Sequence, residues 1–220
     1  MSLQGVGRDF STRRLCVILD SGIAGIDHSL EVAEQVLSGG CRFIQARNKL
    51  MNDRERLMLL NLVIERASTY DAWVVVNDRV DLAILAGADG AHLGQDDLAI
   101  ADARRLFLAA GMQNFIIGQS VGSDDEAVQA QSDGADYVGY GAVYSTSTKQ
   151  DAVEVGLEGL AAVRNSVEIP VFGIGGIGLD CVDEVLSAGA FGVAVCSAIV
   201  DAPDPMRATR DFITAIDRAS

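Results

Sequence analysis

The sequence has few prolines, histidines and cysteines, and each shortage excludes a class of protein. Three prolines against 23 glycines argue against a proline-rich linker and indicate many tight turns. The two histidines, His28 and His92, are too few for a histidine-rich zinc site. No CxxC pair occurs among the four cysteines, which lie in or beside apolar stretches. This pattern favours reduced thiols in a cytoplasmic protein.

Basic residues are also scarce. The sequence has 17 lysines and arginines but 31 acidic residues, which gives a formal net charge of -14. A nucleic-acid-binding surface needs a basic excess, so we expect no nucleic-acid partner. The first 14 residues contain no long apolar segment, and no apolar run reaches the ~20 residues that cross a bilayer. We therefore expect neither a signal peptide nor a membrane partner, while homo-oligomerisation stays open.

Short apolar runs alternate with amphipathic stretches from one end of the chain to the other. This alternation predicts a parallel sheet with helices packed on it. The expected strands are 15–19, 43–45, 73–77, 91–93, 115–118, 137–139, 171–174 and 193–195. The expected helices are 29–38, 53–69, 99–110, 124–132, 157–165, 179–188 and 205–218.

An internal repeat indicates how many strands there are. Gly40, Gly87, Gly134 and Gly189 each end an expected helix just before a strand, as glycine does in the left-handed turn past a helix. Their spacing is about twice the ~30 residues of one β/α unit, so four copies imply about eight strands. We predict a single (β/α)8 TIM barrel over residues 1–220, with 1–12 as a flexible or short-helical extension. An open doubly wound sheet is the alternative.

Active sites of this fold lie on the loops after the strands. After the second strand, alternation places Gln45, Arg47 and Lys49 on one side of the chain. Two cations and an amide in this position would suit a diphosphate and a polar ring. A solvated charged loop explains the same residues.

Carboxylates follow the next two strands. Asn77 and Asp78 come directly after an apolar run, and Asp97 follows the fourth strand. Neighbouring loops would bring the two carboxylates together, and with phosphate oxygens they would form a Mg²⁺ site. Helix capping is the alternative for both segments. His92 is expected as a buried strand residue and not as a ligand or base.

The remaining loops carry hydroxyl groups and glycines suited to phosphate. Ser120 closes the fifth strand, and a segment with Thr146, Thr148 and Lys149 follows the sixth. Glycines follow the seventh strand and a Cys-Ser pair the eighth, where this fold often binds phosphate through backbone N–H groups. The residues in question are Gly175, Gly176, Cys196 and Ser197. Close packing is the alternative reason for the glycines.

These segments, in this order and spacing, resemble the successive motifs of the thiamine phosphate synthase family. The motifs are Gln45-x-Arg47-x-Lys49, Asn77-Asp78-Arg79, the run from Ala88 to Asp97, Ser120, Thr146-x-Thr148-Lys149, residues 173–177 and residues 197–199. The resemblance implies an enzyme that joins hydroxymethylpyrimidine diphosphate to a thiazole phosphate. Its products are thiamine phosphate and diphosphate, and Mg²⁺ is its cofactor.

The resemblance also implies roles for individual residues. Asp78 and Asp97 would hold Mg²⁺, and Arg47, Lys49, Lys149 and Ser120 would act in catalysis. The pyrimidine diphosphate would be bound by Gln45, Arg47, Lys49, Asn77, Ser120 and Lys149. The thiazole phosphate would be bound by Thr146, Thr148, Gly175, Gly176, Cys196 and Ser197.

The chain differs from the usual family sequence at a few positions, and these differences bear on the alternative functions. Gly122 stands where the family usually has a histidine, and Ala142 and Ser145 stand where it usually has prolines; Asn48 replaces a common glutamate. A related thiazole tautomerase needs the histidine that is missing here. Two other functions remain as alternatives. One is a sugar-phosphate isomerase or synthase on a similar barrel, and the other is a non-catalytic paralogue that binds thiamine precursors.

Overall fold

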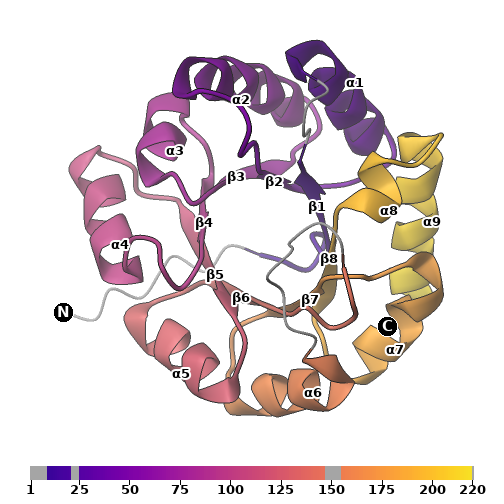
Figure 1. The fold of residues 1–220 in the computed structure, drawn as a ribbon. Coiled ribbons are helices and arrows are strands. Elements are labelled where there is room, and N and C mark those ends of the chain that lie inside the picture. Colours follow the sequence, from indigo (N-terminus) through magenta and orange to yellow (C-terminus); the bar gives the residue numbers. More distant parts are fainter. Residues whose placement is uncertain (1–8, 21–24, 147–154, 220) are drawn as a thin grey trace.

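Eight short parallel strands close into a barrel in the computed structural model, which describes residues 9–20, 25–146 and 155–219 (Figure 1). Each strand pairs with its neighbours in chain order, and β8 pairs with β1. The strands are β1 Leu15–Leu19, β2 Phe43–Ala46, β3 Trp73–Asn77, β4 Gly90–Leu93, β5 Ile116–Val121, β6 Tyr137–Tyr140, β7 Val171–Ile174 and β8 Gly192–Val195. The predicted TIM barrel is confirmed.

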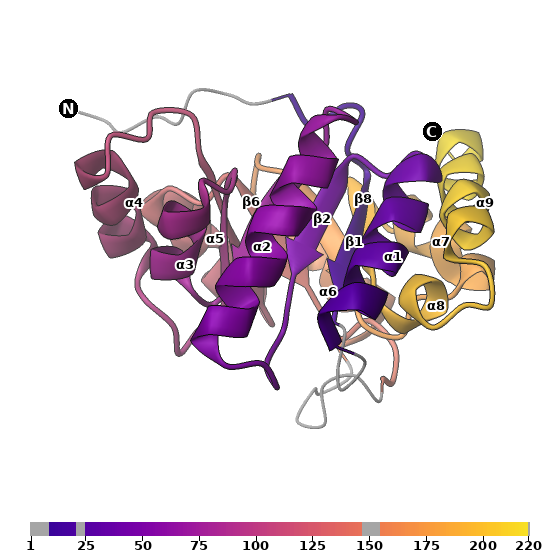
Figure 2. The same cartoon turned by 90° about the horizontal axis from the view of Figure 1, so that it is seen from above.

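Helices surround this barrel and cover its outer face (Figures 1 and 2). They are α1 Gly25–Ser38, α2 Asp53–Ser68, α3 Val80–Ala86, α4 Ile100–Ala109, α5 Asp124–Asp133, α6 Gly156–Ser166, α7 Val182–Ser187, α8 Ser197–Val200 and α9 Pro205–Arg218. Two short helices, α3 and α8, were not predicted. The predicted helix 179–188 is divided into a 3₁₀ turn, Leu179–Cys181, and α7.

The fifth strand extends beyond its predicted end at residue 118, so Ser120 lies within β5 and not after it. The strand was predicted to end at residue 118 because a glycine stands there, and glycine often marks the end of a strand. In the structure a β carbon on Gly118 would lie 2.1 Å from Cζ of Tyr137. The glycine therefore makes room inside the barrel for the tyrosine ring.

Alternation along the strands sends one set of side chains into the barrel and the other toward the helices. The interior cluster includes Ile18, Phe43, Val75, Tyr137 and Phe172. A larger cluster fills the space between the barrel wall and the helices. The same alternation determines which polar side chains face the barrel axis where the strands end.

Phe10 joins the interior cluster from the N-terminal side. Its ring lies 5.1 Å from that of Trp73 and 5.7 Å from that of Tyr137, measured between centroids. Residues 9–12 form a turn without helix, and residues 1–8 lie outside the part described here. The described part of the predicted extension therefore packs against the barrel.

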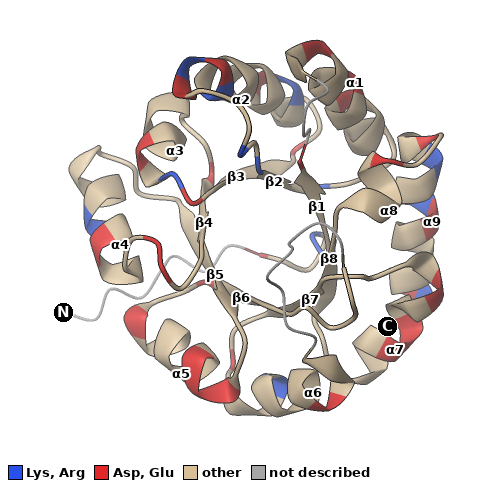
Figure 3. Ribbon diagram, in the orientation of Figure 1, with Lys and Arg blue, Asp and Glu red and all other residues tan. Residues whose placement is uncertain are grey.

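The four repeated glycines have positive φ angles: 108° at Gly40, 67° at Gly87, 96° at Gly134 and 100° at Gly189. Each follows a helix and turns the chain into the next strand, as the repeat predicted. Acidic residues are spread over the outer helices, while a basic segment follows β2 close to the barrel axis (Figure 3). Among the described residues, no helix combines the length and apolar character needed to cross a membrane.

Candidate active site

Polar side chains replace apolar ones where the strands reach their C-terminal ends. Gln45 follows Phe43 on the inward face of β2, and Asn77 follows Val75 on that of β3. Gln45 is buried, whereas Asn77 and Ser120 are half-buried. Three side chains from the predicted site therefore face the barrel axis at the same end.

Arg47 follows β2 and forms an ion pair with Asp20, which follows β1. Both side chains are largely buried, with 18% and 16% of their area exposed. The backbone N–H of Arg47 also donates to the carbonyl of Leu19 at 2.9 Å. Asp20 was missed by the sequence analysis, although its position directly after the first strand was a usable signal.

Lys49, from the same loop as Arg47, meets Asp78 from the loop after β3. The ammonium nitrogen lies 3.7 Å from Oδ2 of Asp78, and the two side chains are 56% and 31% exposed. Asp78 has a φ of 65°, a left-handed conformation that costs a non-glycine residue roughly 1 kcal/mol. Its backbone N–H donates to the carbonyl of His92 at 2.9 Å, which ties this loop to β4.

Asp97 brings a second carboxylate to Asp78. Burial, followed by the hydrogen bond and negative charge of Asp97, raises the pKa of Asp78, while Lys49 and Arg47 lower it. Two acids placed this way repel each other unless a proton or a cation lies between them. The pair therefore has the electrostatic character of a cation site.

Neither carboxylate caps a helix, which was the alternative explanation for both. Helix α3 begins after Arg79 and α4 after Ala99, and neither helix has a side-chain cap. Oδ2 of Asp97 instead accepts from the N–H of Gly94 at 2.6 Å, within its own loop. This bond orients the Asp97 carboxylate.

Oxygen donors of this kind suit Mg²⁺, which usually takes one or two carboxylates and completes its shell with water and phosphate oxygens. Among the residues with described positions, no group of three or more His, Cys, Asp or Glu could hold a metal. Two carboxylates alone fit an ion that arrives with a phosphate ligand. They fit a permanently bound structural metal poorly.

His92 lies inside the barrel, as predicted, and connects two hydroxyl groups. Its Nδ1 lies 2.9 Å from the Tyr137 hydroxyl and its Nε2 lies 2.9 Å from Oγ of Ser120. Burial lowers the pKa of His92 to about 4, so the ring is neutral at pH 7. If the buried tyrosine donates to Nδ1, then Nε2–H donates to Ser120. The Ser120 proton then remains available to a ligand.

The glycine turn after β7 packs closely against the loop after β6. Gly175 and Gly176 have φ angles of 91° and 66°. A β carbon on Gly175 would lie 2.6 Å from that of Ala142, and one on Gly176 would lie 2.5 Å from the carbonyl oxygen of Ser145. Close packing thus accounts for both glycines, and a role in phosphate binding would be additional.

Cys196 directly precedes the short helix α8, and Ser197 is the first residue of this helix. Cys196 is half-buried and Ser197 is exposed. Burial, with contributions from Asp20 and Asp201, raises the pKa of the Cys196 thiol to about 12. The thiol is therefore protonated at neutral pH, which disfavours it as a nucleophile and leaves the segment open to phosphate.

Thr146 is half-buried near the end of the described part of the loop after β6. Thr148 and Lys149, which were assigned to substrate binding, lie outside the described residues. The structure thus brings together the predicted residues from β2, β3, β4 and β5. Tyr137, the inner partner of His92, was not foreseen because a tyrosine in a strand usually indicates only core packing.

Comparisons with known proteins point to one family. The family model for thiamine monophosphate synthase matches residues 15–199. The chain is 44% identical to the thiamine-phosphate synthase of Methanospirillum hungatei, over 90% of this chain and 95% of that protein. It is 42% identical to that of Moorella thermoacetica, over 93% and 96%. A thiamine phosphate pyrophosphorylase structure from Pyrococcus furiosus superposes with a TM-score of 0.87 at 37% identity, covering 96% of this chain and 99% of that chain.

Proposed function

The chain belongs to the thiamine monophosphate synthase family, and from that premise we propose a Mg²⁺-assisted coupling of two small substrates. The substrates are hydroxymethylpyrimidine diphosphate and a thiazole phosphate. The products are thiamine phosphate and diphosphate. The observation that carries the proposal is the meeting of Lys49, Asp78 and Asp97 at one end of the barrel, beside Arg47.

The reaction replaces one bond at the pyrimidine methylene carbon by another. The C–O bond to diphosphate breaks, and its electron pair leaves with the diphosphate oxygen. The thiazole nitrogen then supplies the pair for the new C–N bond. Because the amino-pyrimidine stabilises the cation between these steps, no protein nucleophile is needed. The thiol of Cys196, protonated at neutral pH, is consistent with such a mechanism.

The protein's task is to favour departure of the diphosphate. We assign this to Arg47 and Lys49, with Lys149 from the segment outside the described residues. Mg²⁺, held by Asp78 and Asp97, would supply further positive charge to the leaving group. Fixed positive charges in a partly buried site stabilise a developing anion without reorganising water. The Asp20 carboxylate holds the Arg47 side chain in place for this role.

Orientation of the two substrates is the second requirement. Gln45 and Asn77 face the barrel axis and offer amide groups to the pyrimidine ring. Ser120 offers a hydroxyl proton in the tautomer in which Nε2–H of His92 donates to its oxygen. We place the thiazole phosphate at Thr146, Thr148, Gly175, Gly176, Cys196 and Ser197, on the loops after β6, β7 and β8.

The rival functions find less support. A tautomerase would need a proton shuttle at position 122, where Gly122 has no side chain. The described histidine nearest to Ser120, His92, is buried and neutral between two hydroxyl groups. A binding protein without turnover would not need two carboxylates with mutually unfavourable charge beside Lys49. The four free thiols agree with a reducing, cytoplasmic setting.

A coupling assay with both purified substrates tests the proposal. Thiamine phosphate and diphosphate should appear in equal amounts when Mg²⁺ is present, and a chelator should stop the reaction. Binding of both substrates without product would favour the non-catalytic alternative. Product formation that is unaffected by the chelator would contradict the metal assignment.

A further inference from the structure

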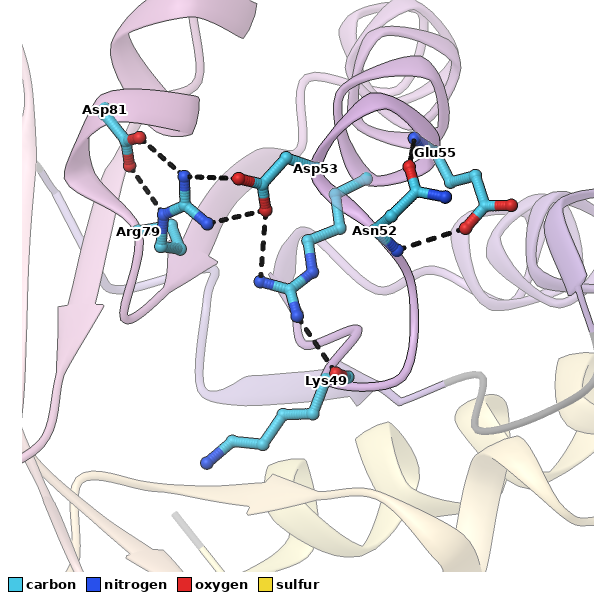
Figure 4. A network of polar contacts seen from close by, with 7 residues as sticks. Lys49, Asn52, Asp53, Glu55, Arg79 and Asp81 are labelled. Carbon is cyan, nitrogen blue, oxygen red and sulfur yellow. Dashed lines mark hydrogen bonds and ion pairs between the residues drawn. The ribbon is translucent and has the colours of Figure 1, made fainter.

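Arg79 directly follows Asp78, yet two other carboxylates hold its guanidinium. Nη1 and Nη2 donate to the two oxygens of Asp53 at 2.7 and 3.1 Å. Nε and Nη2 donate to the two oxygens of Asp81 at 2.8 and 2.6 Å (Figure 4). These carboxylates raise the pKa of Arg79 above its usual range. Because Nε, Nη1 and Nη2 all donate to carboxylates, the Arg79 guanidinium is engaged within the protein.

Asp53 connects the same network to the loop after β2. Its Oδ1 lies 3.8 Å from Nη1 of Arg56, and Nη2 of Arg56 donates to the backbone carbonyl of Lys49 at 2.9 Å. The side chain of Lys49 extends away from these contacts (Figure 4). The network therefore holds the backbone of Lys49 and leaves its ammonium group to Asp78.

The centre of the network is fixed by a helix terminus. Asp53 is the first residue of α2, and Asn52 caps this helix in a reciprocal arrangement with Glu55. The side chain of Asn52 accepts from the N–H of Glu55 at 3.1 Å, and the Glu55 carboxylate accepts from the N–H of Asn52 at 3.1 Å. This capping box fixes the start of α2, and with it the position of Asp53.

The two loops border a pocket. It has a volume of about 230 Å³, with Leu60 and Leu82 among its apolar lining and Lys49, Asp78 and Arg79 among its polar lining. Where side chains are not packed, the relative position of two loops depends on directed polar contacts. The ion pairs of Arg79 and Arg56 supply such contacts here.

We propose that Arg79 and Asp53 form a positioning pair that holds the loop of Asp78 in register with the loop of Lys49. The inference rests on the proposed function, because Lys49 and Asp78 are assigned there to diphosphate and Mg²⁺. Asp78 has a left-handed backbone, and Arg79 is the residue next to it. Fixing Arg79 at Asp53 and Asp81 therefore fixes the direction in which the Asp78 carboxylate points.

The pair has a recognisable signature, since its carboxylates are exposed and Arg79 itself is 32% exposed. The side chains of Asp53 and Asp81 are 61% and 59% exposed. Exposed ion pairs contribute little to the free energy of unfolding. Loss of the pair should therefore change binding at the site much more than it changes the melting temperature.

The first experiment measures binding of inorganic diphosphate by calorimetry, with Mg²⁺ present. We expect Arg79→Gln to raise the Kd about tenfold relative to wild type, because the guanidinium loses its contacts with both carboxylates. Arg79→Lys should weaken binding similarly, because lysine keeps the charge but cannot hold two carboxylates in a fork. Full binding by Arg79→Lys would overturn the proposal.

The matched control is Arg66→Gln, in the last turn of helix α2, whose first residue is Asp53. Arg66 pairs with Glu34 at 3.2 Å and is also exposed. This variant should bind diphosphate like wild type. The double variant Asp53→Asn, Arg79→Gln should be little worse than Arg79→Gln alone, because both changes break one unit. Fully additive losses would contradict a shared role.

A second experiment does not depend on the proposed function. Amide hydrogen exchange at positions 78 and 79, relative to the intrinsic rate of each sequence and without ligand, should become about tenfold faster in Arg79→Gln and stay unchanged in Arg66→Gln. Unchanged exchange in Arg79→Gln would overturn the positioning role. If wild type binds no diphosphate but exchange responds as expected, the proposed function fails while the positioning role stands.

Discussion

The ammonium nitrogen of Lys49 lies 3.7 Å from Oδ2 of Asp78, although different β/α loops carry the two residues. Asp97, from a third loop, raises the pKa of the same carboxyl group. Opposite and like charges thus converge on Asp78. This is the arrangement expected where a magnesium ion and a diphosphate share one site.

Substitution of Asp97 should separate catalysis from folding. Asp97→Ala removes one of two proposed oxygen ligands, so we expect the Mg²⁺-dependent coupling rate to fall about a hundredfold or more. The melting temperature should change little, because the residue is only half-buried. The exposed neighbour Asp96 provides the control, and Asp96→Ala should keep wild-type turnover. Unchanged turnover in Asp97→Ala would remove Asp97 from the metal site.

The charges around Asp78 make opposite predictions for two variants. Asp97→Asn removes a like charge and should lower the pKa of Asp78 toward its usual value. Lys49→Gln removes an opposite charge and should raise this pKa further. Carboxyl-carbon NMR titration without metal measures both shifts. Shifts of the same sign in both variants would show that the two groups do not converge on Asp78.

Lys149 is assigned to the diphosphate from the sequence alone. We expect Lys149→Ala to raise the KM for the pyrimidine diphosphate or to slow its ionisation, by about tenfold or more. Steady-state kinetics with the thiazole phosphate held saturating separates these effects. Wild-type values of both constants would exclude Lys149 from the site.

Neutral His92 makes the fold sensitive to mild acid. Its pKa is about 4 in the folded chain and near its usual 6.5 when unfolded. The unfolded state therefore binds more protons between these values, and stability falls as pH decreases from about 6.5 toward 4. From pH 7 to pH 5 this component amounts to about 2 kcal/mol. Urea unfolding at both pH values measures it.

The free energy of unfolding of His92→Gln should not show this loss between pH 7 and pH 5, whatever the stability of the variant at pH 7. His28, exposed on α1, provides the control, and His28→Gln should keep the pH dependence of wild type. An equal loss of stability in wild type and His92→Gln would show that the ring is not buried in its neutral form.

Gly118 should tolerate no side chain. A β carbon there would lie 2.1 Å from Cζ of Tyr137, so Gly118→Ala forces the ring to move and should destabilise the fold by about 1–3 kcal/mol. In Gly122, the added carbon would find only Glu126 Oε2 at 3.7 Å, and Gly122→Ala should be nearly neutral. Thermal unfolding compares the two. Equal stability of both variants would contradict the packing of Tyr137 against β5.

Much of the fold follows from local patterns. The strands at 15–19, 73–77 and 171–174 have their predicted bounds, because apolar runs there end in turns or polar residues. Helix α3 was missed because Asn77-Asp78-Arg79 was considered as a site or a cap, leaving only seven residues before Gly87. Ser120 was placed after its strand because the close approach of Tyr137 to Gly118 is a tertiary contact.

In the site, too, local patterns predicted some features, while contacts between distant segments determined others. Alternation along β2 and the order of the loops predicted that Arg47, Lys49, Asp78 and Asp97 would gather at one end of the barrel. The pairing of Arg47 with Asp20 could not be read from the sequence, because it joins two loops across the first strand pair. The hydrogen bonds of His92 to Tyr137 and Ser120 depend on the barrel's closure, which local periodicity does not specify.

A crystal structure with Mg²⁺ and diphosphate would show whether both ligands bind where Asp78 meets Lys49. We expect a magnesium ion within about 2.1 Å of oxygens from both Asp78 and Asp97, bridged to a diphosphate that Arg47 and Lys49 contact. Diphosphate bound at another end of the barrel, or a metal that ignores both carboxylates, would contradict it.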